Sequence, residues 1–366
     1  MKTAQKTIAA FAFGALGVAT GALAGEEKVL NVYNWSDYIG ETTIADFEAA
    51  TGIKVNYDTF DSNEILETKL LVGGSGYDVV VPVSNFLARQ IQIGVFRKLD
   101  HDALTNFGNL DPELMAKLAV FDPGNAHSVP YTWGTTGIGI NDVLVSARME
   151  DAPWTSWEFI FNPEILSKFA DCGVAMIDSP TQVVATALNY LGKDPNSEDL
   201  GDLAAAMDLL AAIRPYIRHF NTDLLINGMA SNDLCVVLDW SGDVSQAFLR
   251  AEEAGSGAEL IYSIPDEGAE VFFDVLAIPA DAPHPENAQV FLDFMLKPEV
   301  IAEVTNYVYY ANANAAARSH VAEEILADPG IYPPAEVQEK LFSLTPRSPK
   351  YTRALNRAWA AFKSGN

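Results

Sequence analysis

The sequence predicts an α/β protein whose mostly parallel sheet is assembled from repeated strand–helix units. Strand-like and helix-like segments alternate through the N-terminal third of the chain, a pattern that favours parallel pairing with helical crossovers. Apolar residues make up 49% of the sequence, which is typical of a globular protein with a sizeable core. The 366 residues leave enough chain for two domains after a leader segment is set aside.

The N-terminus has the pattern of a secretory signal peptide. Two lysines and an apolar segment over residues 8–18 precede a small-x-small tripeptide that ends at Ala24. The apolar segment is shorter than the roughly 20 residues that a membrane-spanning helix needs. We therefore expect residues 1–24 to be cleaved and the mature protein to begin near Gly25, in the periplasm. A retained N-terminal anchor is the alternative.

The composition is strongly acidic. Lys and Arg number 23 against 49 Asp and Glu, which gives a formal net charge of −26, and cleavage of the leader removes two more lysines. This charge argues against nucleic acid or an anionic membrane surface as a partner. We interpret most of the carboxylates as solvated surface, so that the charge alone does not identify a ligand.

The N-terminal third contains three predicted strands that alternate with three predicted helices. Gly52 is placed to end the first of these helices. The strands are expected over Val29–Trp35, Lys54–Phe60 and Tyr77–Pro82, and the helices over Thr42–Ala50, Asn63–Val72 and Asn85–Ile93. In such sheets the ligand crevice lies beyond the carboxyl ends of the strands. The segments that follow strands are therefore candidates for a site: Asn34–Tyr38, Pro82–Asn85 and Trp240–Asp243.

A second unit begins near Trp133–Gly137, a polar stretch that we interpret as a possible hinge. Strands are expected beyond it over Leu234–Leu238 and Phe272–Ile278, and helices over Leu203–Ile213, Asn287–Leu296 and Pro298–Val308. No segment has the composition of a long linker. We therefore expect the two units to be joined by short crossing strands.

Three motifs couple an aromatic ring to an acid: Asn34–Tyr38, Asp239–Asp243 and Phe272–Asp274, with Tyr307–Tyr310 as a fourth aromatic cluster. This pairing suits an alkylammonium ligand, because a cationic head is attracted to ring faces and its methylenes bury against them. Each ammonium also needs a carboxylate, since an unpaired buried charge costs several kcal/mol. A single motif of this kind is better explained as a core ring beside a surface acid, but three of them favour a site.

Nothing in the sequence indicates an enzyme. No Gly-x-Ser-x-Gly, HExxH, phosphate-loop or GxGxxG pattern is present, and the five histidines are scattered without ligand spacing. We predict no catalytic residue, no metal and no cofactor. Cys172 and Cys235 are the only cysteines, and in an oxidising compartment a disulfide is favoured over two free thiols.

With these residues in view, the chain resembles the periplasmic putrescine/spermidine-binding proteins of ABC transporters, and the putrescine branch most closely. The likeness covers essentially the whole mature sequence. It is carried by YNWSDYI from Tyr33, FEAATGIKVNYDTFDSNE from Phe47, YDVVVP from Tyr77, LNYLGKDPNS from Leu188, DWSGDV from Asp239, FFDVLAIPADA from Phe272, YYANAN from Tyr309 and DPGIYPP from Asp328.

The resemblance implies a two-lobed periplasmic-binding-protein fold, type II-like, with a ligand cleft between lobes joined by crossing strands. We expect lobe 1 over residues 25–136 plus about 258–308, and lobe 2 over 137–257 plus about 309–366. The two cysteines also match a cysteine pair that resembles a family disulfide.

The resemblance further implies ligand-binding residues from both lobes. Asp243 is expected to pair with one ammonium, and Phe272 stands where spermidine-preferring relatives tend to carry tryptophan. The expected set is Trp35, Ser36, Asp37, Tyr38, Ser84, Asn85, Gln182, Trp240, Asp243, Phe272, Asp274 and Tyr310.

Two positions depart from the family pattern. Val83 stands where a serine is expected after the third strand, with Ser84 and Asn85 next, and Gln182 replaces a ligand-binding glutamate. Loss of that glutamate removes one countercharge on the lobe 2 side. In one interpretation, water and neighbouring acids compensate for the lost charge. In the other, the ligand carries only one full ammonium group on that side, as in a capped amine such as γ-glutamylputrescine.

The function that the sequence predicts is capture of a polyamine, most simply putrescine, by a monomeric clamp that delivers it to an inner-membrane ABC permease. Within this class the alternative is a capped amine or another small cation. A signalling receptor that presents bound amine to a membrane sensor is a second alternative. A hydrolase of amine amides is a third, and the missing nucleophile weighs against it.

Overall fold

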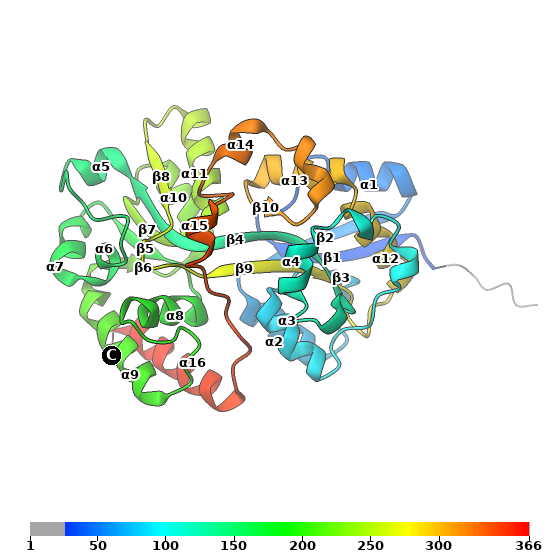
Figure 1. Cartoon of the computed structure of the whole chain (residues 1–366), viewed down its shortest axis with the longest axis horizontal. Helices are drawn as coiled ribbons and strands as arrows, with labels where there is room; N and C mark the ends of the chain where they lie inside the picture. Colours follow the sequence, from blue (N-terminus) through cyan, green and yellow to red (C-terminus); the bar gives the residue numbers. More distant parts are fainter. Residues whose placement is uncertain (1–25, 366) are drawn as a thin grey trace, which may run out of the picture.

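Two separate hydrophobic cores divide the chain into two lobes that lie side by side (Figure 1). The computed structural model describes residues 26–365, so that the predicted signal peptide over 1–24 lies outside the described residues. We name as lobe 1 the part built on the core from residues 30–133 and 272–332. Lobe 2 is built on the core from residues 138–269 and 351–362.

Lobe 1 begins with strand–helix repeats, as the alternation of apolar segments predicts. Gly52, in the left-handed conformation at φ 70°, ends α1, and the Ser62 side chain caps α2. The elements are β1 (Val29–Trp35), α1 (Thr43–Thr51), β2 (Lys54–Phe60), α2 (Asn63–Val72), β3 (Val79–Val80), α3 (Ser84–Gln92) and α4 (Pro112–Leu118). After the excursion into lobe 2 the chain returns as β9 (Val271–Ala277), α12 (Pro285–Met295), α13 (Pro298–Val308), β10 (Ala311–Asn312) and α14 (Glu323–Ala327).

Lobe 2 surrounds a short sheet with helices. Its strands are β5 (Val174–Met176), β6 (Ile217–His219), β7 (Val236–Trp240) and β8 (Leu260–Ser263). Its helices are α5 (Asp142–Ser146), α6 (Glu158–Phe161), α7 (Pro163–Leu166), α8 (Pro180–Tyr190), α9 (Leu200–Ile213), α10 (Leu225–Ala230) and α11 (Ser241–Ala254). The last segment crosses back through α15 (Ala335–Gln338) and adds α16 (Pro349–Ser364) to this lobe (Figure 1).

One long strand, β4 (Ser128–Asn141), joins the lobes, and all of its residues are buried. Its first half pairs with β9 in lobe 1, and its second half pairs with β7 and β8 in lobe 2, all antiparallel. The described strands therefore form one continuous sheet in the order β2-β1-β3-β9-β4-β7-β5-β6. Parallel pairs lie on both sides of this antiparallel centre, between β1 and β2 and between β5 and β7.

The observed cores differ from the expected lobe boundaries at two places. Strand β8 pairs with the lobe 2 half of β4, although residues 258–270 were expected in lobe 1. Residues 311–332 pack into lobe 1, because β10 pairs with β4 at Trp133 and Thr132. The stretch Trp133–Gly137, interpreted from its polarity as flexible, is a buried part of β4, since neighbouring strands satisfy its backbone on both sides.

The predicted disulfide between Cys172 and Cys235 is present, with a Cα–Cα distance of 5.6 Å. The two cysteines lie just before β5 and β7, which are parallel neighbours in the sheet. The bond therefore ties together two strands of lobe 2 that are 63 residues apart in sequence.

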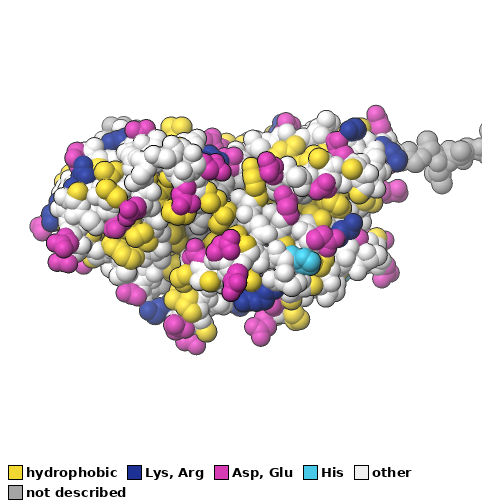
Figure 2. Space-filling model, turned by 90° about the horizontal axis from the view of Figure 1, so that it is seen from above, with side chains coloured by type: hydrophobic (Ala, Val, Ile, Leu, Met, Phe, Trp, Pro, Cys, Tyr) yellow, Lys and Arg dark blue, Asp and Glu magenta, His cyan; other side chains and the backbone are white. Residues whose placement is uncertain are grey.

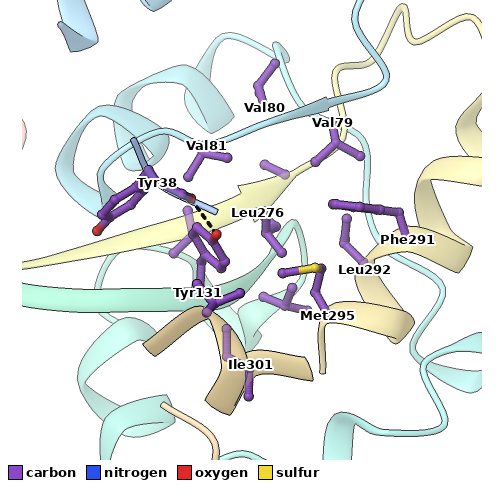
Figure 3. Close-up of a cluster of buried hydrophobic side chains, with 14 of the residues drawn as sticks. Tyr38, Val79, Val80, Val81, Tyr131, Leu276, Phe291, Leu292, Met295 and Ile301 are labelled. Carbon is purple, nitrogen blue, oxygen red and sulfur yellow. Dashed lines mark hydrogen bonds between the residues drawn. The ribbon is translucent and has the colours of Figure 1, made fainter. Parts of the chain in front are cut away.

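The core of lobe 1 holds the end of β1 in place (Figure 3). Tyr131 on β4 lies in this core and its hydroxyl donates a hydrogen bond of 2.6 Å to the backbone oxygen of Tyr38. Asn34 donates to the same oxygen at 2.9 Å. These bonds fix the turn after β1, where Asp37 adopts a positive φ of 52° that Asp tolerates better than most residues.

Acidic side chains are spread over both lobes on the face seen in Figure 2 and do not gather in one patch there. This distribution agrees with their interpretation as solvated surface. Among the helices of residues 26–365, none has the length and apolar character needed to span a membrane.

Candidate functional site

A cavity lies between the lobes, where strand ends of both lobes converge. Five carboxyl groups line it, those of Asp37, Asp61, Asp223, Asp243 and Asp274. No Lys, Arg or His is among the described residues of its lining. The remaining lining side chains are Trp35, Ser36, Tyr38, Phe60, Asn63, Val83, Gln182, Thr222, Ile226, Trp240, Phe272 and Tyr310. A site with this balance selects cations.

Five aromatic rings form a chain around the cavity. Trp35 at the end of β1 meets Trp240 at the end of β7 edge to face, with centroids 5.7 Å apart, and this contact joins the two lobes. The chain continues from Trp240 to Phe272 at 6.2 Å and from Phe272 to Tyr310 at 6.3 Å. It ends at Tyr38, whose ring lies 4.8 Å from that of Tyr310. Such a box of rings can bury an alkyl chain and attract its charged ends.

The carboxyl group of Asp274 is only half satisfied by the protein. Tyr38 donates to its Oδ2 at 2.7 Å, but its buried Oδ1 has no hydrogen-bond partner among the described residues. The side chain comes from β9 and is 3% exposed. A buried acceptor without a partner is costly, so Oδ1 is suited to receive a donor from a ligand.

Asp243 faces the cavity from the first turn of α11. The hydroxyl of Tyr310, which belongs to lobe 1, donates to Asp243 Oδ1 at 2.7 Å and so links the lobes. Gly242 makes this approach possible, because a Cβ there would lie 2.1 Å from the Tyr310 ring. A side chain at position 242 would therefore displace the ring.

Burial shifts two acids of the cavity, Asp274 and Asp243, toward their neutral forms. It raises the pKa of Asp274 to about 8, although the hydrogen bond from Tyr38 opposes the rise. Burial likewise raises the pKa of Asp243 to about 6, against the hydrogen bond from Tyr310. A bound cation would reverse these shifts, because an opposite charge nearby favours the ionised carboxylate.

Gln182, in the first turn of α8, lies between the cavity and a second buried acid. Its Oε1 accepts from the Trp240 indole at 3.2 Å, and its Nε2 donates to Glu270 Oε2 at 2.8 Å. Glu270 also accepts from the Thr136 hydroxyl at 3.1 Å. Burial raises the pKa of Glu270 to about 7, against the hydrogen bonds from Gln182 and Thr136.

The structure brings most of the expected site residues to this one cavity. Ser84 and Asn85 are exceptions: α3 begins at Ser84, which is buried away from the cavity, and Asn85 lines a separate cavity beside Arg89. The structure therefore does not support ligand contact by either residue. Their neighbour Val83 lines the cavity instead and contributes an apolar wall.

Several lining residues were missed in the sequence. Phe60 and Asp61 stand at the end of β2, so the rule that found Trp35 at the end of β1 could have found them. Thr222 and Asp223 follow the short strand β6 in a 3-10 helix (Thr222–Leu224), and Ile226 lies in α10. The three-residue β6 gave too weak a pattern to be recognised as a strand.

Comparison with known proteins agrees with this geometry. Residues 42–333 match the family described as bacterial extracellular solute-binding protein. The chain is 50% identical to the putrescine-binding periplasmic protein of Escherichia coli, covering 99% of this chain and 98% of that protein. It is 48% identical to a putrescine-binding periplasmic protein of Pseudomonas aeruginosa over the full length of both.

A solved structure from Listeria monocytogenes, described as a putative spermidine/putrescine ABC transporter, superposes with a TM-score of 0.84 at 33% identity. The superposition covers 93% of this chain and all of the other. The predicted periplasmic-binding-protein fold and the predicted resemblance are thereby confirmed. The family binds solutes, so the expectation of a location outside the cytoplasm and of a non-enzymatic role is confirmed as well. The chain belongs to the family of bacterial extracellular solute-binding proteins.

Proposed function

We propose that this protein captures a short polyamine, with putrescine as the leading candidate, and delivers it to an ABC permease in the inner membrane. The observation that carries the proposal is the unpartnered Oδ1 of Asp274 in a cavity lined by five carboxyls and no basic side chain. A primary ammonium supplies three donors and a full positive charge to such a group.

The shape of the site supports a linear diamine. Asp274 and Asp243 come from different lobes, and each accepts a hydrogen bond from a tyrosine of the ring chain, Tyr38 for Asp274 and Tyr310 for Asp243. Each methylene buried against these rings stabilises the complex by about 0.8 kcal/mol. The names of the relatives support the same ligand, since those with 50% and 48% identity are putrescine-binding proteins.

Calorimetric titration of ligand-stripped protein with putrescine, cadaverine, agmatine, spermidine and γ-glutamylputrescine tests the proposal. We expect the free diamine to bind tightly. If only the capped amine releases heat, Val83 and Gln182 have redirected the same site to a ligand with one ammonium. Absence of binding heat with all five compounds would refute amine capture.

Asp243→Asn tests the pairing of one ammonium with lobe 2. Truncating one partner of a buried charge pair costs about 2–5 kcal/mol, so we expect putrescine affinity to fall at least about thirty-fold. Asp208→Asn is the matched control, because Asp208 is an exposed acid on α9 of the same lobe. Unchanged affinity in Asp243→Asn would show that the ammonium does not pair there.

A further inference from the structure

The acid missing at position 182 has a counterpart in the structure one side chain further from the cavity. Glu270 is 2% exposed and stands just before β9, against the end of α8 that carries Gln182. It does not line the cavity, but a hydrogen-bonded chain connects it to the cavity wall: the Trp240 indole donates to Gln182, and Gln182 donates to Glu270.

The chemistry of its two ends fixes the direction of this chain. The indole N–H of Trp240 can only donate, so it requires the oxygen of the Gln182 amide. An ionised Glu270 can only accept, so it requires the nitrogen of that amide. With both ends satisfied, Gln182 holds its carbonyl dipole with the negative end toward Trp240 and the cavity, and the carboxylate behind it strengthens that polarisation.

No direct ion pair neutralises Glu270 within the part of the chain that the structure describes. The charge of Arg347 acts on Glu270 from further away and favours its ionised form, while the Arg347 guanidinium donates to the backbone oxygen of Pro195. The charge of Glu270 in turn raises the pKa of Asp274. A buried carboxylate without a cation is unfavourable, and a cationic ligand in the adjoining cavity would supply one.

We propose that Glu270 is a specificity-determining residue that acts through Gln182, and that it adds a further negative charge, beside that of Asp243, on the side of the site where the second ammonium of a diamine lies. The inference rests on the proposed function. A carboxylate at position 182 would place a negative charge on the lobe 2 side of the site directly. Glu270 behind Gln182 places the same charge there indirectly. This charge should strengthen the binding of putrescine, which has two ammonium groups. A monoamine that pairs with Asp243 or Asp274 does not need the charge.

Glu270→Gln keeps the size of the side chain and an acceptor for Gln182 while removing the charge. We expect its affinity for putrescine to fall about ten-fold and its affinity for 1-butylamine to change less than three-fold, by calorimetric titration at pH 8. Glu259→Gln is the matched control, because Glu259 is an exposed acid just before β8 that does not line the cavity.

A second variant separates charge from structure. Gln182→Glu combined with Glu270→Gln moves the acid to the cavity wall, and we expect the pair to restore putrescine affinity to at least that of the unmodified protein. The single variant Gln182→Glu would bring two carboxyl groups within hydrogen-bond distance of each other, so that one stays protonated and the gain is smaller.

The results that would refute the role of Glu270 differ from those that would refute the proposed function. If the unmodified protein binds no amine, the proposed function fails first. If it binds putrescine but Glu270→Gln matches Glu259→Gln for both amines, the role of Glu270 is refuted. Equal losses for putrescine and 1-butylamine that the double variant does not restore would mean that Glu270 serves structure alone.

Discussion

Single carboxyl groups decide how this site responds to pH. Burial raises the pKa of Asp274 to about 8 and that of Asp243 to about 6 in the ligand-free protein. An aliphatic ammonium keeps its proton up to a pH of about 10. Between pH 6 and 8 Asp243 is therefore mostly ionised, whereas Asp274 still carries a proton that binding of a cation must release.

We expect putrescine affinity to increase with pH across this range, by up to about ten-fold per pH unit for each carboxyl that loses a proton. Titration calorimetry at pH 6, 7 and 8 measures this slope, and Asp274→Asn should flatten its upper half. An affinity that is constant from pH 6 to 8 would contradict the raised pKa values.

The same pKa shifts make the ligand-free protein less stable as pH rises, although they make putrescine binding tighter. A carboxyl whose pKa is raised by folding binds its proton more tightly in the folded state than in the unfolded state, where the pKa is about 4. The free energy of unfolding therefore falls as pH rises from about 4 through about 8. Thermal melts should show the stabilisation by putrescine growing over that range.

Sequence reasoning found residues at the ends of two recognisable strands, β1 and β7, but overlooked those at the end of β2. Trp35 and Trp240 stand at the ends of β1 and β7, whose apolar runs are clear in the sequence. Ser84 was expected shortly after the third strand, but β3 ends at Val80, and whether Ser84 faces the cavity depends on where α3 starts. Glu270 precedes a strand and acts through another side chain, so only packing in three dimensions reveals it.

At the scale of helices and strands, prediction worked best where neighbours in sequence determine the element. The bounds of β1, β2, α2 and α13 match those expected from apolar patterns and stop signals. β3 is two residues long although six were expected, because its pairing with β1 and β9 covers so little of it. The long buried β4 was missed because its polar residues gain their partners from strands remote in sequence.

The helix α11 depends on a glycine at its second residue. We expect Gly242→Ala to push the Tyr310 ring away, break its 2.7 Å bond to Asp243, and weaken putrescine binding at least ten-fold. Circular dichroism should show an intact fold, since alanine favours helices more than glycine does. Unaltered affinity would mean that the ring moves without cost.

The disulfide also acts between individual strands, because it ties β5 to β7. Replacing both Cys172 and Cys235 by serine should lower the free energy of unfolding by about 2–5 kcal/mol, as for other native disulfides. Urea titration measures the loss, and the unmodified protein under reducing conditions is the control that should show the same loss. Equal midpoints for the oxidised protein and the variant would contradict a stabilising role.

At the scale of the whole molecule, the lobes touch each other across the cavity through polar and aromatic contacts. Tyr310 bonds to Asp243, Trp35 meets Trp240, and Arg250 on α11 lies 3.1 Å from Asp37 after β1. A ligand that bridges the lobes adds to these contacts only in the closed arrangement, and this difference in affinity drives closure.

The pair between Arg250 and Asp37 is partly exposed, with side chains 33% and 53% accessible, so its contribution should be small. We expect Arg250→Gln to change putrescine affinity by no more than about five-fold. Arg353→Gln, an exposed arginine on α16, is the control. A loss above fifty-fold would show that Arg250 organises the site itself.

Because the chain passes between the lobes three times, the order in which it leaves the secretion channel does not follow the order of its lobes. The strands of lobe 2 are complete by Ser263 and α16 is added to its core later, whereas the sheet of lobe 1 must wait for β9 and β10. We therefore expect lobe 2 to fold first, with both of its cysteines already available to form the disulfide. Pulse-labelled hydrogen exchange during refolding should find the amides of β5 and β7 protected before those of β1 and β3.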